Sequence, residues 1–181
     1  MSIIDTIKSE AISKYEEILD LVKRCNILEL KSVTLNRNLL SDEINSLKEF
    51  DLPNARYIYL IKFNSNSNDK IINEFNQFVI NNQDRERKLN LSRFNSENKE
   101  NDSQLLYVGT SKSIKSRLKQ HLGFSSSNQT YALHLKHWFP SDVDIQIDII
   151  EVSSKDKMVF EAIEQAYWDK FKPLFGKRSG L

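Results

Sequence analysis

The chain has 181 residues and a formal net charge of +1, from 26 Lys and Arg against 25 Asp and Glu. This length suits one domain, or one small domain with an extension, and the 39% hydrophobic content is enough for a core. A near-neutral charge neither requires nor excludes a nucleic-acid partner, so the distribution of charge has to decide. Cys25 is the only cysteine, which excludes an internal disulfide framework and a cysteine-rich zinc site.

The sequence gives no sign of a membrane or secretory protein. No apolar run approaches the roughly 20 residues that a bilayer-spanning helix needs. The start of the chain, residues 1–5, lacks the basic residues and apolar stretch of a secretory signal. We therefore expect a cytoplasmic protein with no membrane partner.

Residues 1–55 are predicted to be an N-terminal helical extension. One apolar stripe recurs every seven residues, at Ile4, Ala11, Ile18 and Cys25. The stripe either docks onto the main domain or contacts a partner. A second, shorter helix is predicted to begin at Ser41, since the two acidic residues that follow suit a helix N-terminus.

Residues 56–181 are predicted to form an α+β domain with a small three-stranded antiparallel sheet flanked by helices. The first strand covers 56–63, with Tyr57 and Tyr59 on one face and Ile58 on the other. The second covers 105–108. In the third, over 143–149, isoleucines alternate with polar residues, which indicates a half-buried strand with one solvated face.

Helices are predicted between and after these strands. They cover 71–79, 112–122 and 130–139, and the last runs to about Lys172, because Pro173 disfavours helix in the residue before it. Residues 64–104 form an insertion between the first two strands. Its part from 81 to 103 is Asn-rich and polar, and we expect a long loop.

A basic stretch follows the second strand. Between Tyr107 and His121 the chain carries four Lys or Arg residues and no acid. Arg117 and His121 are four residues apart and share a helix face. A guanidinium there can bind a phosphate through two parallel hydrogen bonds. The charge pattern alone is also that of a solvated amphipathic helix.

The order and spacing of five features resemble the GIY-YIG nuclease superfamily. These features are Tyr57-Ile58-Tyr59, Tyr107-Val108-Gly109, Arg117, His121 and Glu164. In that family two strands carry the triplets, an arginine and a histidine or tyrosine follow on a helix, and a glutamate lies in a later helix before a proline. The resemblance covers about residues 56–176.

The resemblance implies a metal-dependent endonuclease that hydrolyses DNA phosphodiester bonds, in a restriction, repair, mobile-element or defence setting. It implies that Glu164 binds one Mg²⁺ or Mn²⁺ ion and that Arg117 steadies the scissile phosphate. Either Tyr59 or Tyr107, helped by His121, would deprotonate the attacking water. A tyrosine with a pKa of about 10 needs nearby cations for this task. A single carboxylate suits magnesium, which keeps several of its waters.

We expect DNA, most simply double-stranded, to contact further basic residues. These are Lys112, Lys115, Lys119, Lys136, His137, Lys172 and Lys177. A zinc site at His134 and His137 is disfavoured by their spacing and by the lack of further ligands. Cutting both strands requires a homodimer or two successive nicks, because a monomer of the family has one active centre.

The sequence also departs from the family pattern. Tyr57 replaces the leading glycine of the first triplet, and the 64–104 insertion, which we expect to carry specificity, replaces a short turn. Gly176 stands where the family commonly has an asparagine, and Thr110 where some relatives carry a lysine. A degenerate member that binds nucleic acid or protein without cutting is therefore an alternative. An unrelated interaction module is a third, and it predicts that Tyr107, Arg117 and Glu164 lie far apart.

Overall fold

The computed structural model describes residues 2–35, 56–64, 68–95 and 103–178. In chain order the elements are α1 (Ile3–Arg24), β1 (Ile27–Leu35), β2 (Tyr57–Phe63), α3 (Asn68–Gln83), β3 (Leu105–Ser111), α4 (Ile114–Leu122), the 3-10 turn η4 (Leu135–His137), β4 (Ile145–Val152) and α5 (Lys157–Phe171). The predicted helix at Ser41 lies outside the described residues. None of the described helices is long and apolar enough to cross a membrane.

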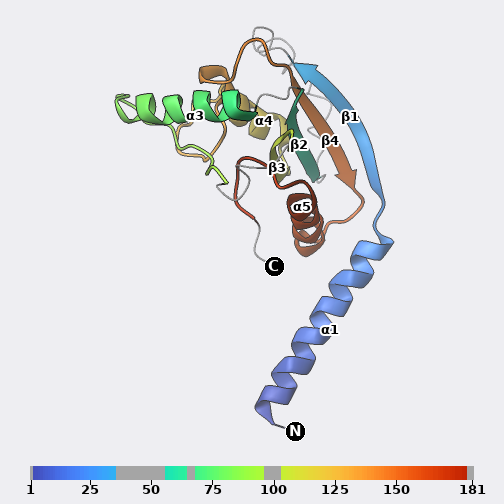
Figure 1. Cartoon of the computed structure of the whole chain (residues 1–181). Coiled ribbons are helices and arrows are strands. Elements are labelled where there is room, and N and C mark those ends of the chain that lie inside the picture. Colours follow the sequence, from blue (N-terminus) through green and yellow to red (C-terminus); the bar gives the residue numbers. More distant parts are fainter. Residues whose placement is uncertain (1, 36–55, 65–67, 96–102, 179–181) are drawn as a thin grey trace.

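The described strands form one antiparallel sheet in the order β1-β4-β2-β3 (Figure 1). The predicted α+β class with an antiparallel sheet is confirmed, whereas the prediction of three strands is wrong. The fourth strand, β1, comes from the segment that was predicted to be helical. It pairs with β4 from Ile27 opposite Val152 to Leu35 opposite Ile145. Such pairing between distant segments outweighs local preference, so a local pattern does not reveal it.

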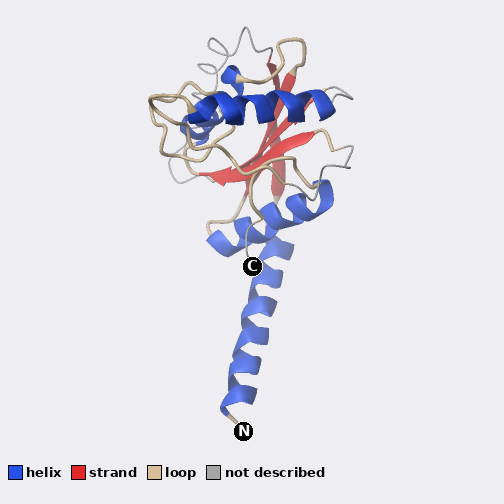
Figure 2. Ribbon diagram, turned by 60° about the vertical axis from the view of Figure 1, so that its left-hand side comes forward, coloured by secondary structure: helices blue, strands red, loops and turns tan. Residues whose placement is uncertain are grey.

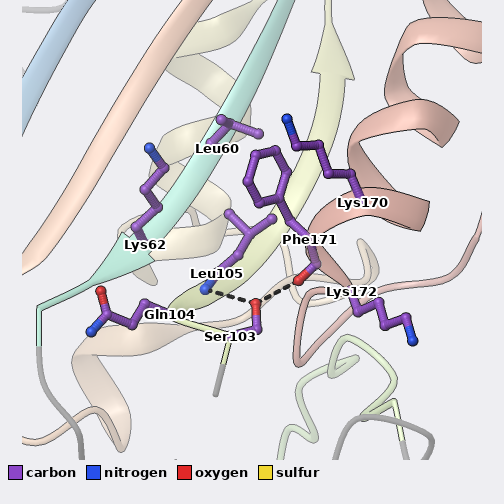
Figure 3. A pocket seen from close by; sticks show the side chains of 8 residues that line it. All are labelled: Leu60, Lys62, Ser103, Gln104, Leu105, Lys170, Phe171 and Lys172. Carbon is purple, nitrogen blue, oxygen red and sulfur yellow. Dashed lines mark hydrogen bonds between the residues drawn. The ribbon is translucent and has the colours of Figure 1, made fainter. Parts of the chain in front are cut away.

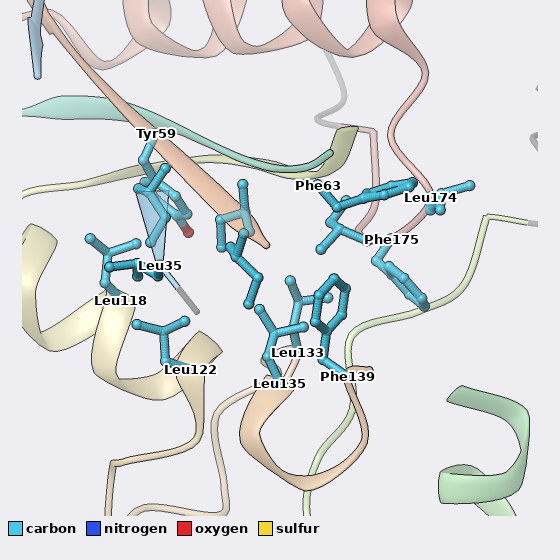
Figure 4. Close-up of a cluster of buried hydrophobic side chains, with 14 of the residues drawn as sticks. Leu35, Tyr59, Phe63, Leu118, Leu122, Leu133, Leu135, Phe139, Leu174 and Phe175 are labelled. Atoms are coloured by element: carbon cyan, nitrogen blue, oxygen red, sulfur yellow. The ribbon is translucent and has the colours of Figure 1, made fainter. Parts of the chain in front are cut away.

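Helices cover both faces of the sheet (Figures 1 and 2). On one face, Tyr59 and the alternate β2 residues on the same side, Tyr57, Ile61 and Phe63, pack against α3, α4 and the segment around η4. Figure 4 shows Leu118 and Leu122 of α4 pointing toward Tyr59 and Leu35. On the other face, Ile58 of β2 packs beneath α5. The predicted alternation of β2 is confirmed, and both of its faces are buried.

The sequence predicted that the polar face of β4 is solvated, but Asp148 on this face is buried. Asp148 is only 3% exposed, and it accepts hydrogen bonds from Ser32 Oγ at 2.7 Å and Gln146 Nε2 at 2.8 Å. It also forms an ion pair with Lys62. Burial raises the pKa of Asp148, but the hydrogen bonds from Lys62, Gln146 and Ser32, with the charge of Lys62, outweigh it and hold the pKa below its usual value. A polar network therefore joins β1, β4 and β2.

Helix α1 begins with a capping box, in which Ser2 and Asp5 exchange side-chain to backbone hydrogen bonds. Only its C-terminal part packs on the domain, where Val22 lies against the α5 side of the sheet. Its first turns project away from the body (Figures 1 and 2), and Ile4 and Ile7 are exposed. Docking is thus confirmed for the end of the helix alone.

The predicted helix over 130–139 is wrong apart from the short turn η4. His134 has φ +53, outside the right-handed helical region. The backbone groups of the segment serve other partners: Ala132 N–H donates to Asn90 O at 3.1 Å, and Leu133 O accepts from Trp138 Nε1 at 2.6 Å. These tertiary hydrogen bonds replace the helical ones.

The described end of the insertion is fixed to the domain at several points. The side chain of Asn82 donates to Leu89 O and accepts from Leu89 N–H, both at 3.0 Å. Further along, Ser92 N–H donates to Ala132 O at 2.9 Å. Asn95 N–H donates to Leu174 O at 2.8 Å. Residues 90–92 therefore run beside Ala132, and residues 93–95 run beside the C-terminal segment that follows α5.

Candidate active site

Strands β2 and β3 place the two predicted tyrosines side by side. Antiparallel pairing sets Tyr59 opposite Gly109 and Ile61 opposite Tyr107. The rings of Tyr59 and Tyr107 are stacked, with centroids 6.0 Å apart and planes 14° from parallel. The two triplets thus bring two phenol hydroxyls to one place on the α4 side of the sheet.

The glycine of the second triplet is required by close packing. A Cβ at Gly109 would lie 2.6 Å from Tyr59 Oη and 2.8 Å from Tyr107 Cε1. Both are shorter than any ordinary contact, and both tyrosines would have to move. Gly109 is therefore what allows the two rings to meet.

Arg117 of α4 binds both phenols through one guanidinium. Its Nε donates to Tyr59 Oη at 3.1 Å, and its Nη2 donates more weakly to Tyr107 Oη at 3.4 Å. The third nitrogen, Nη1, donates to Gln120 Oε1 at 2.8 Å, one helical turn later. The fork geometry of arginine thus ties α4 to β2 and β3.

His121 lies fully buried beneath this pair, with Nε2 3.0 Å from Tyr59 Oη. The backbone N–H of Leu133 donates to its Nδ1 at 3.4 Å. Burial, with the charges of Arg117 and His134, lowers the pKa of His121 well below its usual value, so the ring is neutral. A neutral ring that accepts at Nδ1 carries its proton on Nε2. His121 therefore donates a hydrogen bond to Tyr59.

The two tyrosines have different surroundings. Tyr59 is 1% exposed, and its oxygen receives hydrogen bonds from both Arg117 and His121. Burial, followed by the proximity of Tyr107, raises the pKa of Tyr59 well above its usual value. Tyr107 is half-buried, so part of its side chain reaches solvent.

Gly176 packs against the edge of the Tyr107 ring opposite Gly109. It has φ +114, and a Cβ there would lie 3.1 Å from both Tyr107 Cε2 and Trp168 Cζ3. This left-handed backbone favours glycine strongly over any other residue. The departure from the family's asparagine therefore has a structural basis: the backbone itself is the packing surface for Tyr107.

Glu164 belongs to α5 and lies next to the edge strand β3. Its carboxylate is hydrogen-bonded to the side chain of Thr110, which directly follows the second triplet. Burial is the main cause that raises the pKa of Glu164, Glu161 adds to it, and Arg117 and Arg56 oppose it. Glu164 is therefore within electrostatic range of Arg117 and Tyr59. The distant placement expected for an unrelated module is wrong.

Glu164 is the residue that could hold a metal ion. Among the described residues there is no group of three or more His, Cys, Asp or Glu side chains able to bind one. A half-buried carboxylate that is difficult to ionise and is repelled by Glu161 is nevertheless suited to a nearby cation. The donor set fits a magnesium-like ion, which takes one carboxylate and fills its other positions with water and phosphate oxygens.

The structure distributes the predicted nucleic-acid contacts over several places. Lys112, Lys115 and Lys119 lie on or just before α4, the helix of Arg117. Near the end of α4, Lys136 Nζ lies 4.8 Å from the centroid of the Phe124 ring. The ring of His137 stacks on Phe78 of α3 at 5.9 Å.

Lys172 lies apart from the tyrosines, at a recess of about 630 Å³ beyond the end of α5 (Figure 3). Lys62 and Lys170 also line this recess, whose floor includes Leu60 and Leu105. Both leucines belong to the α5 face of the sheet, opposite the face that carries Tyr59. Lys177 lies at a different cavity, beside Gly176.

Sequence reasoning missed several residues of the cluster. Gln120 accepts from Arg117, and the three-residue spacing on a predicted helix was the available signal. Thr110 was noted only as a departure from a lysine, yet its hydroxyl binds Glu164. The contact of Gly176 with Tyr107 depends on tertiary packing and has no local signal.

Comparison with known families agrees with this geometry. One model of the GIY-YIG catalytic domain matches residues 96–178, and a second matches residues 57–133. Together the matches span both triplets, Arg117, His121 and Glu164. The chain belongs to the GIY-YIG nuclease superfamily, whose members act on DNA and generally use divalent metal ions. No curated protein and no solved structure matches the chain.

Installing the family's asparagine at Gly176 should damage the site. We expect Gly176→Asn to lower the free energy of unfolding by about 1–3 kcal/mol, because the new Cβ is strained at this φ and crowds Tyr107 and Trp168. Urea unfolding measures this. Gly123→Asn is the matched control: its φ is +88, but the nearest atom to a new Cβ is the flexible Lys136 Cγ at 3.0 Å. A more stable Gly176→Asn variant would contradict the packing role.

Glu164→Gln should stabilise the metal-free protein at neutral pH. A carboxyl whose folded pKa is raised binds its proton more tightly in the folded state, so its ionised form costs stability above the unfolded pKa of about 4.3. Removing the charge restores that stability, and the difference should vanish below about pH 4, where both states are protonated. Urea unfolding in EDTA at the two pH values tests this, with Glu16→Gln, at an exposed residue of the projecting helix α1, as control. A variant less stable at neutral pH would show that Glu164 is held by favourable ionic contacts.

Proposed function

We propose that this protein is a metal-dependent endonuclease that hydrolyses DNA phosphodiester bonds. The observation that carries the proposal is the guanidinium of Arg117 bound to the hydroxyls of both Tyr59 and Tyr107, with Glu164 within its electrostatic range. A cation, a phenol and a carboxylate meet where a phosphate can enter, because both Tyr107 and Arg117 are only half-buried.

Arg117 would stabilise the charge that develops on the phosphate. Its Nη2 contact to Tyr107 is the longest of its hydrogen bonds, and the second N–H of this nitrogen can donate to a phosphate oxygen. Nε and Nη1 stay bound to Tyr59 and Gln120 and keep the group oriented. Donors that are held in place before the reaction stabilise a transition state most effectively.

Tyr107 is the tyrosine that would deprotonate the attacking water. It reaches solvent, and its oxygen lies 3.4 Å from Arg117 Nη2, which would also contact the phosphate. Tyr59 is buried and remains a neutral phenol, so we assign it a positioning role toward Arg117. His121 is also buried and donates to Tyr59. It supports the arrangement without contacting substrate.

Glu164 would hold a single Mg²⁺ or Mn²⁺ ion. Such an ion, when bound, neutralises charge on the phosphate and on the leaving oxygen. Thr110 would orient the carboxylate through its hydrogen bond. The neighbouring Glu161 is partly occupied by an ion pair with Lys157 Nζ at 2.8 Å and would not be a ligand.

DNA would approach along α4, where Lys112, Lys115 and Lys119 lie on or just before the helix of Arg117, with Lys136 and His137 extending the basic surface. Double-stranded DNA is the substrate that we propose. Cleavage of both strands would then use either two copies of the chain or two successive nicks. The second candidate is a catalytically degenerate domain that binds without cutting, which the loss of the asparagine at Gly176 favours.

A plasmid cleavage assay separates these two functions. Supercoiled DNA is incubated with Mg²⁺, with Mn²⁺ or with EDTA, and nicked and linear products are measured. We expect metal-dependent cleavage that Glu164→Gln abolishes and Glu161→Gln retains. Arg117→Lys keeps the charge but loses the fork, and should reduce the rate about 100- to 1,000-fold.

Each negative result has a definite meaning. Cleavage by Glu164→Gln at the native rate would remove the metal role of this residue. An Arg117→Lys rate within twofold of native would reduce the arginine to a surface charge. If the native protein shifts DNA on a gel but never cuts it, the degenerate binding domain is the correct function.

A further inference from the structure

A second cavity lies behind Tyr107, between the insertion and the C-terminal segment. Its volume is about 230 Å³, and it is lined by Arg93, Phe94, Asn95, Trp168, Gly176, Lys177 and Arg178. Three of these residues are cationic and none is acidic. The cavity is thus a basic site built from segments far apart in the sequence.

Backbone hydrogen bonds hold its walls together. Gly176 N–H donates to Arg93 O at 2.8 Å, and Phe94 bridges to Phe175 in antiparallel fashion. Phe175 N–H in turn donates to Leu106 O of β3 at 2.9 Å. Arg93 and Lys177 are therefore carried on segments that are registered against the strand of Tyr107.

The cations of this cavity are available to an anion. The side chains of Arg93 and Lys177 are exposed, and neither forms an ion pair within the described part of the chain. Arg178 is partly neutralised, because its Nε and Nη2 donate to Asp169 at 2.7 and 2.8 Å. Among the described residues that line the cavity, Arg93 and Lys177 are therefore the cations that form no ion pair with another described residue.

Only one residue separates the cavity from the candidate active site. Gly176 lines the cavity and also packs against the ring of Tyr107, where a Cβ would lie 3.1 Å from Cε2. Any larger residue here would widen the wall between them. A substrate strand whose scissile phosphate lies at Tyr107 and Arg117 would therefore have this cavity next to its flanking backbone.

We propose that this cavity binds a backbone phosphate of the DNA strand that flanks the scissile phosphodiester, with Arg93 and Lys177 as its ligands. The inference rests on the proposed function and adds to it a substrate-positioning site to which the insertion contributes Arg93. Such contacts fix the position of a strand without reading its sequence.

The test is binding of a fluorescently labelled DNA duplex in EDTA, followed by anisotropy over a series of salt concentrations. Removing two phosphate contacts should make the slope of log affinity against log salt shallower by about 2. The test protein is the Arg93→Gln, Lys177→Gln double variant. The matched control is Lys8→Gln, Lys14→Gln, which removes two exposed lysines from the projecting helix α1. Its slope should equal that of the native protein.

Native-like melting of both double variants confirms that only charge has changed. A test variant whose slope and affinity equal those of the control overturns the phosphate site, whatever the plasmid assay shows. Conversely, a shallower slope in a protein that never cuts DNA supports the phosphate site while the nuclease proposal fails. In an active protein, cleavage at limiting DNA should fall with the affinity in the test variant and not in the control.

Discussion

The arrangement of the site depends on one interaction, the guanidinium of Arg117 bound to two phenols on neighbouring strands. It joins α4 to β2 through Tyr59 and to β3 through Tyr107, so three elements share one rigid contact. The contact needs Gly109, because any side chain there would separate the two rings. It also needs a donor behind Tyr59, which the buried His121 supplies. Tyr59 and Gly109 of the two triplets thus meet the geometric requirements of a single hydrogen-bonded unit with Arg117.

Burial divides the ionisable groups of this unit into two kinds. Tyr59 and His121 are excluded from water and are kept neutral by it, which suits them to holding other groups in place. Burial and the nearby Glu161 raise the pKa of Glu164, so the ionised carboxylate is costly until a cation is near. A site of this kind gives up stability for function, as is common where charges are arranged for a reaction.

Much of the fold and of the site could be predicted from sequence, and the misses share a cause. The period-two pattern of Tyr57, Tyr59 and Ile61 predicted β2 and its two faces, and the spacing of Arg117 predicted its place beside Tyr107. Strand β1, the irregular 130–139 segment and the burial of Asp148 all depend on partners far away in the sequence. No local pattern encodes such partners. The role of Gly176 was hidden for the same reason, since it arises where the C-terminal segment meets β3 and the insertion.

Single-turnover cleavage as a function of pH distinguishes the proposed roles of the two tyrosines. If Tyr107 is the base and Tyr59 supports Arg117, Tyr107→Phe should reduce the cleavage rate about 100- to 10,000-fold. The rate of this variant should also no longer rise with pH. Tyr59→Phe should be slower but should keep the native pH profile. If Tyr107→Phe retains the native pH profile and Tyr59→Phe loses it, Tyr107 is not the base and the buried Tyr59 takes that role.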